Sequence, residues 1–587
     1  MKTTKAILGI NSVYHESSAC LVVNGKLVAA IEEERLSRIK HAKEAKIDNP
    51  NELPMQAINE CLRIGNLTLS DIDEIGFSFE PQRRLDENLK VDDLYEAENW
   101  GSKEGEELFY LKLKEVPYQL KELGFKGEFV YIEHAIAHAA STFYPSGFED
   151  AAIVSIDGIG EIESSTIAHG KGSTITKIQQ VEYPNSIGFL WEKMAKFLGY
   201  SEYDACKVMS IASFGEPEKF MSAYEKFITL NNDTFFKIDK DIIKFRIEDY
   251  TDLEEIFGIP KRSFNDPLLK VHQDIAASLQ EITTTIVMNM VQKAYEKTQS
   301  KKLCLAGGVA LNCVTNRIIF ENSKFEDIYI QPAANDAGTA LGAALKLYTE
   351  GLEGNERITL NHTYLGPSFN NNDIQAAIEA KGLVYREHEN IEEIVAELLT
   401  EGKVIGWFQG AMEFGPRALG NRSLLADPRD PGMVKKLNSV VKHREDHRPF
   451  CPSVLAEDAA EWFNIGKEAT AADYMLMAYP VNKNKKENIP AVVHVDGTSR
   501  IQKVQKSTNP KYHKLITKFK ELTGVPLLLN TSFNDREPIV CTPENAINTF
   551  LKTKIDVLVL GNNLMLKEEN VHLKSAEQKL SLQGLEA

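Results

Sequence analysis

The chain has 587 residues, of which 43% are hydrophobic and 26% charged, with 36 glycines and 22 prolines. This composition excludes a disordered, collagen-like or low-complexity protein, and the length excludes a single small module. Lysine and arginine total 67 and aspartate and glutamate 85, so the formal charge at pH 7 is −18. A protein that mainly binds nucleic acid needs the opposite sign over much of its surface, so we expect no nucleic-acid partner.

The seven cysteines are widely spaced, include no CxxC pair and are odd in number. This pattern favours neither a disulfide framework nor a zinc framework and is typical of a reducing compartment. The apolar run before Asn11 is too short for a signal peptide, and no stretch approaches the roughly 20 apolar residues of a membrane span. We therefore expect a cytoplasmic protein with no membrane partner.

The first part of the chain reads as two hairpin-containing halves of one design. Strands are predicted at residues 6–10, 19–23 and 27–31, and again at 152–156 and 164–168. Asn24-Gly25 separates two strands of the first half and is a strong two-residue hairpin signal, because both turn positions need a positive φ. In the second half the sequence Asp157-Gly158-Ile159-Gly160-Glu161 predicts one polar turn, and residues 169–172 predict another. The repeat indicates a duplicated nucleotide-binding domain.

Helices and further strands follow between and after these halves. Helices are predicted at residues 51–64, 93–123, 131–143 and 271–298, and strands at 302–305 and 328–331. Residues 351–361 have the composition of a domain linker. Beyond it, strands at 404–408, 454–455 and 525–529 among helices predict a second α/β domain, and residues 575–587 predict a polar tail.

Two histidines predict a metal site. His134 and His138 are four residues apart on a predicted helix, so both rings project from one face. Carboxylates from Asp157 and Asp336, each beside glycines at the end of a strand, are able to complete a set that suits iron(II), zinc or a similar ion. The alternative is a pair of surface histidines, since HxxxH alone is a weak signal.

Two glycine-bearing turns are candidate nucleotide contacts. Gly307-Gly308 followed by Asn312, and Gly338 at the start of a helix, would let backbone N–H groups approach phosphates or an adenosine. The alternative is a pair of tight turns in a packed α/β sheet. The sequence contains no GxxxxGK[ST] phosphate loop, so a nucleotide would be bound in another way.

His15 lies in the loop of the first predicted hairpin. A histidine titrates near neutrality and is able to take a proton from a substrate hydroxyl. The alternative is a turn histidine capped by its neighbours.

The densest signal is the run from Glu413 to Pro452. Within about 32 positions it concentrates Arg417, Arg422, Arg429, Lys442, Arg444 and Arg448. Arginine forks bind phosphate and carboxylate oxygens bidentately, and the Gly-Pro and Arg-Pro steps fix the backbone that aims them. This favours an anion pocket over an ion-pair network or a solvated charge run. Arg500 and the polar loop that begins at Asn530 are positioned after predicted strands and are able to close such a pocket.

Together these motifs resemble the NodU/CmcH/TobZ-type carbamoyltransferases over about residues 5 to 565. The resemblance is carried by Gly9 through His15, residues 32–41, the Asp-Gly-Ile-Gly-Glu turn, residues 306–312, 413–423 and 530–543. It implies an α/β protein with a duplicated actin/hexokinase-like (ASKHA) domain at residues 1–355 and a YrdC-like domain at 362–575.

The resemblance also implies a two-step reaction that uses carbamoyl phosphate, ATP and a divalent metal, usually iron(II), with another divalent ion such as magnesium as the alternative. Carbamoyl phosphate would be hydrolysed in the YrdC-like domain, and the carbamate would pass internally to ATP to form carbamoyl adenylate. The carbamoyl group would then move to a hydroxyl of a small-molecule natural product in the N-terminal domain. Because carbamate is unstable in water, a closed path would protect it.

The family's functional residues are carried over by position. The implied metal ligands are His134, His138, Asp157 and Asp336, and the implied base is His15. The implied nucleotide contacts are Gly158, Gly160, Gly307, Gly308, Asn312 and Gly338. The implied carbamoyl phosphate contacts are Arg417, Lys442, Arg448, Arg500 and Asn530.

The sequence departs from the family pattern in two places. Residues 206–215, CKVMSIASFG, replace a more glycine-rich motif, and Arg536 stands where glycine is common. The first change bears on acceptor recognition. There are two alternative functions. The first is a tRNA threonylcarbamoyl-type transferase, which the charge of −18 disfavours. The second is a non-catalytic actin-like nucleotide-binding protein or sugar kinase, which the arginine-rich motif disfavours. The sequence does not identify the acceptor. It also does not decide whether the protein forms a homodimer.

Overall fold

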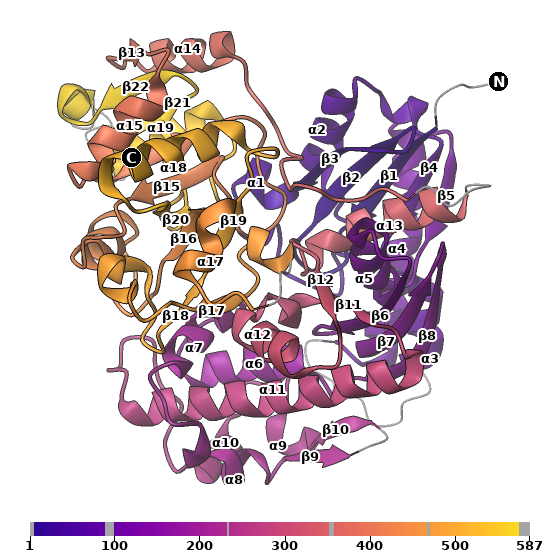
Figure 1. Ribbon diagram of the computed structural model, residues 1–587. Helices are drawn as coiled ribbons and strands as arrows, with labels where there is room; N and C mark the ends of the chain where they lie inside the picture. The colour runs from indigo at the N-terminus through magenta and orange to yellow at the C-terminus, as the bar shows by residue number, and fades with distance from the viewer. Residues whose placement is uncertain (1–4, 89–98, 232–233, 352–356, 467–469, 574–587) are drawn as a thin grey trace, which may run out of the picture. The chain divides into compact units, whose positions relative to one another are not determined.

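A computed structural model describes residues 5–88, 99–231, 234–351, 357–466 and 470–573 (Figure 1). The chain divides into two compact units. The first consists mainly of Met1–Glu34 and His41–Leu360, and the second consists of Arg35–Lys40 together with most of the chain after Leu360. The polar tail expected at residues 575–587 lies outside the described residues.

The first sheet of unit 1 has five strands in the order β3-β2-β1-β4-β5. Its strands are β1 (Ala6–Asn11), β2 (Ser18–Val23), β3 (Lys26–Glu32), β4 (Glu74–Phe77) and β5 (Glu128–Tyr131). The first three are antiparallel, and β4 and β5 continue in parallel from β1. Asn24 and Gly25 have φ of 50° and 75°, as the predicted hairpin turn between β2 and β3 requires.

The second sheet repeats this topology, in the order β12-β11-β6-β7-β8. Its strands are β6 (Asp150–Ile156), β7 (Glu163–Lys171), β8 (Thr174–Glu182), β11 (Lys302–Ala306) and β12 (Asp327–Ile330). The duplicated design is therefore confirmed. The turn expected at residues 169–172 lies at Gly172 and Ser173 instead, because β7 runs through Lys171 and β8 begins at Thr174. Gly170 is needed for packing, since a Cβ there would lie 2.6 Å from the ring of Phe143.

Two helices pack against each other between the sheets. Helix α13 (Ala337–Glu350) packs on β1, β2 and β4, and α5 (His134–Phe143) packs on β6, β7 and β11. The two helices approach closely because a Cβ at Gly342 would lie 1.8 Å from the carbonyl oxygen of Ala137. The helix predicted from residue 131 begins at His134, since Tyr131 still belongs to β5. This pairing brings the N-terminal ends of both helices into the same region.

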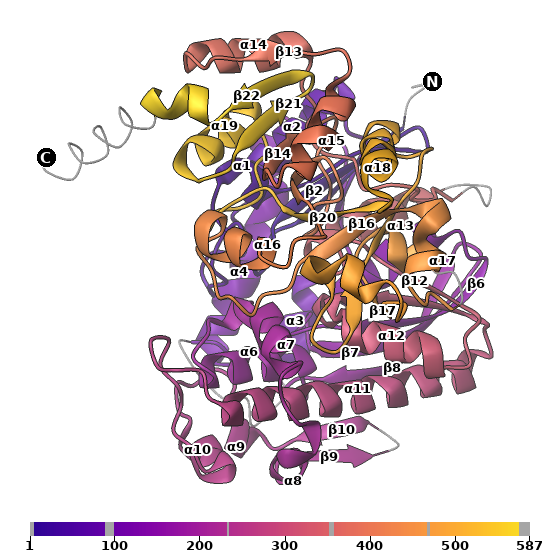
Figure 2. The same cartoon turned by 60° about the vertical axis from the view of Figure 1, so that its left-hand side comes forward.

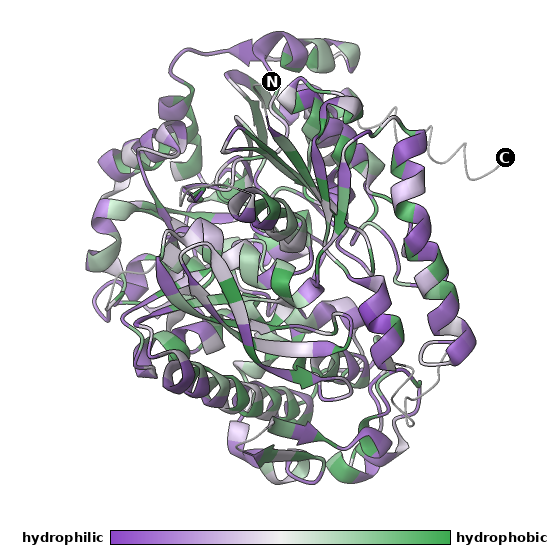
Figure 3. Cartoon of the chain, turned by 90° about the vertical axis from the view of Figure 1, so that its right-hand side faces the viewer, coloured by the Kyte–Doolittle hydropathy of each residue, from purple (hydrophilic) through white to green (hydrophobic). Residues whose placement is uncertain are grey.

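The other helices of unit 1 surround this core. They are α2 (Met55–Gly65), α3 (Pro81–Asn88), α4 (Lys103–Glu122), α6 (Ile187–Phe197), α7 (Ala205–Ala212), α8 (Met221–Tyr224), α9 (Lys240–Ile243), α10 (Thr251–Phe257), α11 (Lys270–Thr298) and α12 (Cys313–Asn322). Figure 2 shows α11 along one side of the unit, above the hairpin β9 (Ile228–Asn231) and β10 (Phe235–Ile238). Outer helices carry hydrophilic faces, whereas many strands are largely hydrophobic (Figure 3).

Two predicted helices of unit 1 begin later than expected. The helix expected at 51–64 begins at Met55, directly after Pro54. The helix expected at 93–123 is α4, which begins at Lys103, because the side chain of Ser102 accepts a hydrogen bond from the Gly105 N–H and caps the helix. Residues 93–98 of that prediction lie outside the described residues.

Unit 2 is built on an eight-stranded sheet in the order β13-β22-β21-β14-β15-β20-β16-β19. Its strands are β13 (Arg386–Glu387), β14 (Ile405–Phe408), β15 (Arg422–Ala426), β16 (Cys451–Leu455), β19 (Gln502–Val504), β20 (Leu527–Ser532), β21 (Val557–Leu560) and β22 (Asn563–Leu566). A separate pair joins β17 (Ala478–Pro480) and β18 (Thr498–Arg500). Its helices are α14 (Asn371–Ala380), α15 (Ile391–Thr400), α16 (Met433–Lys435), α17 (Ala459–Trp462), α18 (Pro510–Thr523) and α19 (Pro543–Lys552). The second α/β domain is confirmed, and its YrdC-like character stays a prediction.

A segment from the N-terminal part of the chain belongs to unit 2, which the sequence did not predict. Helix α1 (Glu33–Ser37) leads into it. Within unit 2, Arg35 donates to the carbonyl of Gly415 at 2.9 Å, and Arg38 donates to that of Ile539 at 2.7 Å. Leu36 packs on a small apolar cluster that includes Ile539. None of the described helices is both long and apolar enough to cross a membrane.

Candidate functional site

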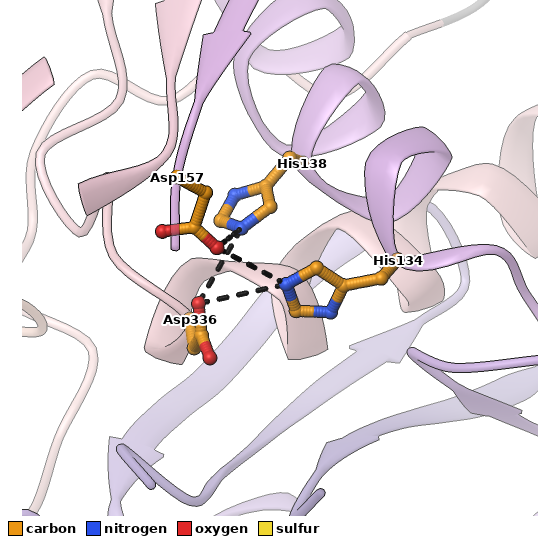
Figure 4. Close-up of side chains that lie close together, drawn as sticks. All are labelled: His134, His138, Asp157 and Asp336. Atoms are coloured by element: carbon orange, nitrogen blue, oxygen red, sulfur yellow. Dashed lines mark hydrogen bonds and ion pairs between the residues drawn. The ribbon is translucent and has the colours of Figure 1, made fainter. Parts of the chain in front are cut away.

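Four side chains predicted as metal ligands converge in unit 1 (Figure 4). His134 is the first residue of α5, and His138 lies one turn later on the same face. Asp157 directly follows β6, and Asp336 directly precedes α13. The packing of α5 on α13 therefore brings together residues separated by up to about 200 positions in the sequence.

The facing atoms have the spacing of a ligand set. Each histidine Nε2 lies 3.3–3.4 Å from Asp157 Oδ2 and 3.5 Å from Asp336 Oδ1, and all four atoms lie within 4.8 Å of one another. Bonds of about 2.1 Å at a tetrahedral angle would place neighbouring ligand atoms about 3.4 Å apart. Two imidazoles and two carboxylates are donors that suit iron(II) or zinc. The residues therefore fit a divalent metal.

The surrounding groups orient this set. His134 Nδ1 lies 3.1 Å from the carbonyl oxygen of Ser78, which favours a proton on Nδ1 and leaves Nε2 with a lone pair. The Gly308 N–H donates to Asp157 Oδ1 at 3.0 Å, so the second carboxylate oxygen faces the histidines. Gly307 has a φ of +85°, and a Cβ there would lie 2.2 Å from the Ile156 carbonyl oxygen. Only glycine fits at that position.

A buried carboxylate that the sequence analysis did not select holds the start of α5. Glu161 is fully buried and accepts hydrogen bonds from the backbone N–H groups of His134 at 2.9 Å and Glu80 at 2.8 Å. Burial and the nearby Glu163 raise the pKa of Glu161 to about 6. Its signal was its place in the predicted Asp157–Glu161 turn, where only the aspartate and the glycines were considered.

The remaining predicted nucleotide residues have structural roles in the fold. Asn312 caps α12 by accepting from the Thr315 N–H at 3.1 Å and donates to Gln280 at 3.0 Å. The Gly338 N–H already donates to the Asn335 carbonyl at 2.9 Å, and a Cβ there would lie 2.0 Å from the Ala333 carbonyl oxygen. At Gly158 and Gly160 the nearest atoms to an added Cβ belong to Phe189, at 3.6 Å, and to His134, at 3.2 Å. A nucleotide contact at these residues stays a prediction.

His15 lies in the loop between β1 and β2, as expected. Its Nδ1 is buried and has no hydrogen-bond partner among the described residues. Its ring meets that of Tyr203 edge-on at 5.4 Å, and the ring of His41 stacks on the same tyrosine at 4.3 Å. His41 Nδ1 in turn lies 2.6 Å from Glu16 Oε1. His15 therefore has an unpartnered ring nitrogen in an aromatic setting.

In unit 2, several predicted anion contacts share one face of the large sheet. Asn530 on β20 pairs directly with Cys451 on β16, and directly opposed residues of antiparallel strands point to the same side. Ser532, two residues further along β20, also faces this side. The buried Lys442 Nζ donates to Ser532 Oγ at 3.1 Å and to Asn534 Oδ1 at 2.6 Å.

Two groups of cations border this face. Arg500 Nε lies 3.3 Å from Cys451 Sγ, and Arg417 and His494 lie near the same sulfur. Burial raises the pKa of the Cys451 thiol, but Arg500, hydrogen bonding with His494 and the charge of Arg417 outweigh burial and lower this pKa to about 6. The second group surrounds Lys442. Burial, together with the charges of Arg444 and Arg448, lowers the pKa of Lys442 well below its usual range.

Asn530, on the same face of the sheet as Cys451, presents an unused acceptor. Its Nδ2 donates to the Ala418 carbonyl at 3.0 Å, to Ser453 Oγ at 2.8 Å and to Gln502 Oε1 at 3.2 Å. Its side chain is buried, and Oδ1 has no hydrogen-bond partner in the described parts of the chain. A buried carbonyl oxygen without a donor costs about 1–3 kcal/mol, so this atom is poised to accept from an N–H group of a ligand.

Three arginines in the dense motif make structural contacts with neighbouring groups of the fold. Arg422 is fully buried, donates to the carbonyls of Pro367, Gln409 and Gly410, and packs over the Phe408 ring at 3.6 Å. Arg429 forms an ion pair with Asp427 at 2.6 Å. Arg444 donates to Asn438 at 2.7 Å and packs over Phe450 at 4.7 Å. Charge density in the sequence did not separate these roles.

Both segments that depart from the family pattern lie among the described residues. Residues 206–212 form most of α7, and Lys207 forms an ion pair with Asp204 at 3.1 Å. Arg536 donates to the carbonyl of His443 at 3.0 Å, next to Lys442. Its guanidinium therefore braces the loop that carries Lys442.

Family models match both units. The carbamoyltransferase N-terminus model matches residues 6–345, and the carbamoyltransferase C-terminus model matches residues 396–567. The chain belongs to the carbamoyltransferase family. The resemblance to NodU-type carbamoyltransferases is thereby confirmed, and the chain is a transferase.

Two of the relatives of this carbamoyltransferase span nearly its full length. An uncharacterized protein of Synechocystis is 36% identical and covers 96% of both chains, and the nodulation protein NolNO of Sinorhizobium fredii is 38% identical over 95% of this chain and 80% of that protein. The nodulation protein NolO of Bradyrhizobium diazoefficiens is 38% identical over 74% of this chain and 79% of that protein. Among solved structures, HypF in its phosphate- and nucleotide-bound form covers 60% of this chain with a TM-score of 0.33 and 14% identity.

Proposed function

We propose that this carbamoyltransferase converts carbamoyl phosphate and ATP to carbamoyl adenylate and transfers the carbamoyl group to a hydroxyl of a small-molecule natural product. In the first step water cleaves carbamoyl phosphate to carbamate and phosphate. Carbamate then displaces pyrophosphate from ATP, and the acceptor hydroxyl finally displaces AMP. The first step is assigned to unit 2 and the later steps to unit 1.

The observation that carries the proposal is the unused Oδ1 of Asn530, on the sheet face where the paired residue Cys451 contacts Arg500. Carbamoyl phosphate combines a phosphate with an amide N–H₂ group. Arg417, Arg500, Lys442 and Arg448 supply the charge that a phosphate requires, and guanidinium groups bind phosphate oxygens bidentately. The Asn530 oxygen supplies the acceptor that the N–H₂ group requires.

The lowered pKa of Lys442 supports the same assignment. Its ammonium is buried beside further cations, and this crowding of like charges weakens its charged form. A bound phosphate would bring negative charge into the group and would favour the protonated lysine. The pocket is therefore electrostatically suited to an anionic ligand.

In unit 1, His134, His138, Asp157 and Asp336 would hold the divalent metal, which supplies positive charge for phosphate oxygens when bound. The contacts of His134 with Ser78 and of Asp157 with Gly308 would fix those ligands in place. We expect iron(II), and the donor set also accommodates other divalent ions.

His15 would act as the base for the acceptor. An alcohol must lose its proton as it attacks a mixed anhydride, and a neutral imidazole accepts that proton near pH 7. The unpartnered Nδ1 of His15 supports this role, because a buried ring nitrogen without a partner is free to bind a ligand hydroxyl.

Phosphate release from carbamoyl phosphate tests the proposal. The wild-type protein should release phosphate from carbamoyl phosphate without ATP, and acetyl phosphate, which lacks the N–H₂ group, should be a poorer substrate. Asn530→Leu, which removes the acceptor oxygen, should reduce this preference, and circular dichroism should confirm that it folds. Equal use of both phosphates by the wild type would contradict the assignment of Asn530.

A further inference from the structure

Arg246 lies among aromatic rings in unit 1, outside the residues discussed so far. It follows α9, and its guanidinium carbon lies 5.1 Å from the ring centroid of Trp100 and 4.9 Å from that of Tyr183. Phe245 and Phe189 extend the ring surface, with centroids 5.9 Å apart, and Phe189 lies 5.7 Å from Tyr183. We call these five residues the Arg246 cluster.

The guanidinium of Arg246 has no matching anion among the residues that the structure describes. Within the described residues it makes no hydrogen bond and no ion pair. Glu106, the nearby carboxylate, already accepts two hydrogen bonds from Arg84, from Nε at 2.8 Å and from Nη2 at 2.9 Å. Burial lowers the pKa of Arg246, which is the direction expected for a cation without a partner. Arg84 is thus satisfied, whereas the N–H groups of Arg246 are available to a ligand.

The cluster borders both loops that the proposed transfer step uses. The ring of Phe189 lies 3.6 Å from the Cβ position of Gly158, the residue after Asp157. On the other side, Tyr14 immediately precedes His15, and its hydroxyl donates to the Gly160 carbonyl at 2.8 Å and accepts from Arg84 at 2.9 Å. Arg84 also packs over Trp100 at 5.6 Å. The cluster therefore spans from the Asp157 loop toward the His15 loop.

We propose that the Arg246 cluster binds the acceptor, and that the acceptor carries an oxyanion, a carboxylate or a phosphate, in addition to its hydroxyl. The identification of this ligand as the acceptor rests on the proposed function. The aromatic rings offer apolar faces for the body of such a ligand. The free guanidinium offers a planar fork that matches a carboxylate or phosphate. Neither feature is needed by carbamoyl phosphate, whose contacts lie in unit 2.

The test uses small aromatic anions as probes of the full-length protein. Trp100 is half-buried, whereas Trp191, Trp407 and Trp462 are buried, so quenching of tryptophan fluorescence should report binding at the cluster. Benzoate and phenyl phosphate are the two anionic arms, and benzyl alcohol is the neutral probe. We expect at least one anion to quench the wild type with clearly higher affinity than benzyl alcohol. The stronger arm identifies the oxyanion.

Arg246→Gln should weaken binding of that anion by about 10- to 150-fold, because a charge-assisted hydrogen bond is lost. Arg63→Gln, which removes an exposed arginine of α2, is the matched control and should bind like the wild type. Arg246→Lys keeps the charge but not the fork and should show a smaller loss, which provides a second test if the glutamine variant fails to fold. Equilibrium dialysis should give the same constants without relying on fluorescence.

Equal affinity of the wild type and both Arg246 variants for the anions would overturn the inference, as would equal affinity for benzyl alcohol. Probe binding requires neither carbamoyl phosphate nor ATP. Loss of the Arg246 effect with intact phosphate release would therefore reject this inference alone. An intact Arg246 effect without phosphate release would instead reject the proposed function.

Discussion

Replacing Arg448 with alanine should impair carbamoyl phosphate use with little effect on folding. The Arg448 side chain is partly exposed, and its ion pair with Glu445 is long, at 3.9 Å, so that pair contributes only about 0–1 kcal/mol to stability. In the proposed pocket the same guanidinium would make a charge-assisted contact with phosphate, typically about 1.5–3 kcal/mol. We therefore expect kcat/KM for carbamoyl phosphate to fall by about 10- to 150-fold.

Two assays separate the pocket from the fold. Arg448→Ala should lose phosphate release from carbamoyl phosphate but transfer normally from pre-made carbamoyl adenylate. Arg386→Ala is the control, because this exposed arginine of β13 pairs with Glu569 and lies five strand positions from β20 in the same sheet, or about 24 Å. Arg422→Ala should instead destabilise the protein by roughly 3 kcal/mol or more, since it leaves buried carbonyls unpaired. If Arg448→Ala lost activity equally in both assays, the assignment of Arg448 to the carbamoyl phosphate pocket would be refuted.

Three further predictions follow from the two sites. His138→Ala should abolish pyrophosphate release from ATP but keep most carbamoyl phosphate hydrolysis, and full ATP-dependent activity in metal-stripped protein would contradict a metal role. His15→Asn should still form carbamoyl adenylate but transfer it about 10²–10⁴-fold more slowly, and wild-type transfer from isolated adenylate would make His15 structural. Cys451 has its folded pKa lowered to about 6, below the unfolded value near 8.5. The stability gained from its thiolate should therefore be complete above about pH 8.5 and lost as the pH falls through 6. The measurement is the difference in Tm between the wild type and Cys451→Ser across that pH range. A difference that does not change with pH would show that Cys451 is an ordinary thiol.

The sequence predicted the parts of the fold that depend on local signals. Asn24-Gly25 specified its turn because both residues adopt a positive φ, and short apolar runs located seven of the ten strands in the two large sheets of unit 1. HxxxH placed His134 and His138 on one helical face. The close approach of α5 and α13, which brings Asp336 to these histidines, depends on small residues such as Gly342 and on long-range packing that spacing does not reveal.

Roles that depend on tertiary partners were beyond the sequence. Arg422 and Arg417 look alike in one motif, yet Arg422 is fully buried against peptide carbonyls while Arg417 lies near Cys451. The segment Arg35–Lys40 belongs to unit 2, although more than 300 residues of the chain separate it from the rest of that unit. Arg246 is not part of any recognisable sequence motif. It stands out only in the structure, where the nearby carboxylate of Glu106 is bound by Arg84 and not by Arg246.

The central claim is that one protein couples carbamoyl phosphate to ATP. The most direct measurement is pyrophosphate release from ATP by the purified, metal-loaded protein, with and without carbamoyl phosphate. The proposed mechanism predicts pyrophosphate only when both substrates are present, together with phosphate from carbamoyl phosphate in at least equal amount. Pyrophosphate release that is independent of carbamoyl phosphate, or release of ADP and phosphate from ATP instead, would contradict it.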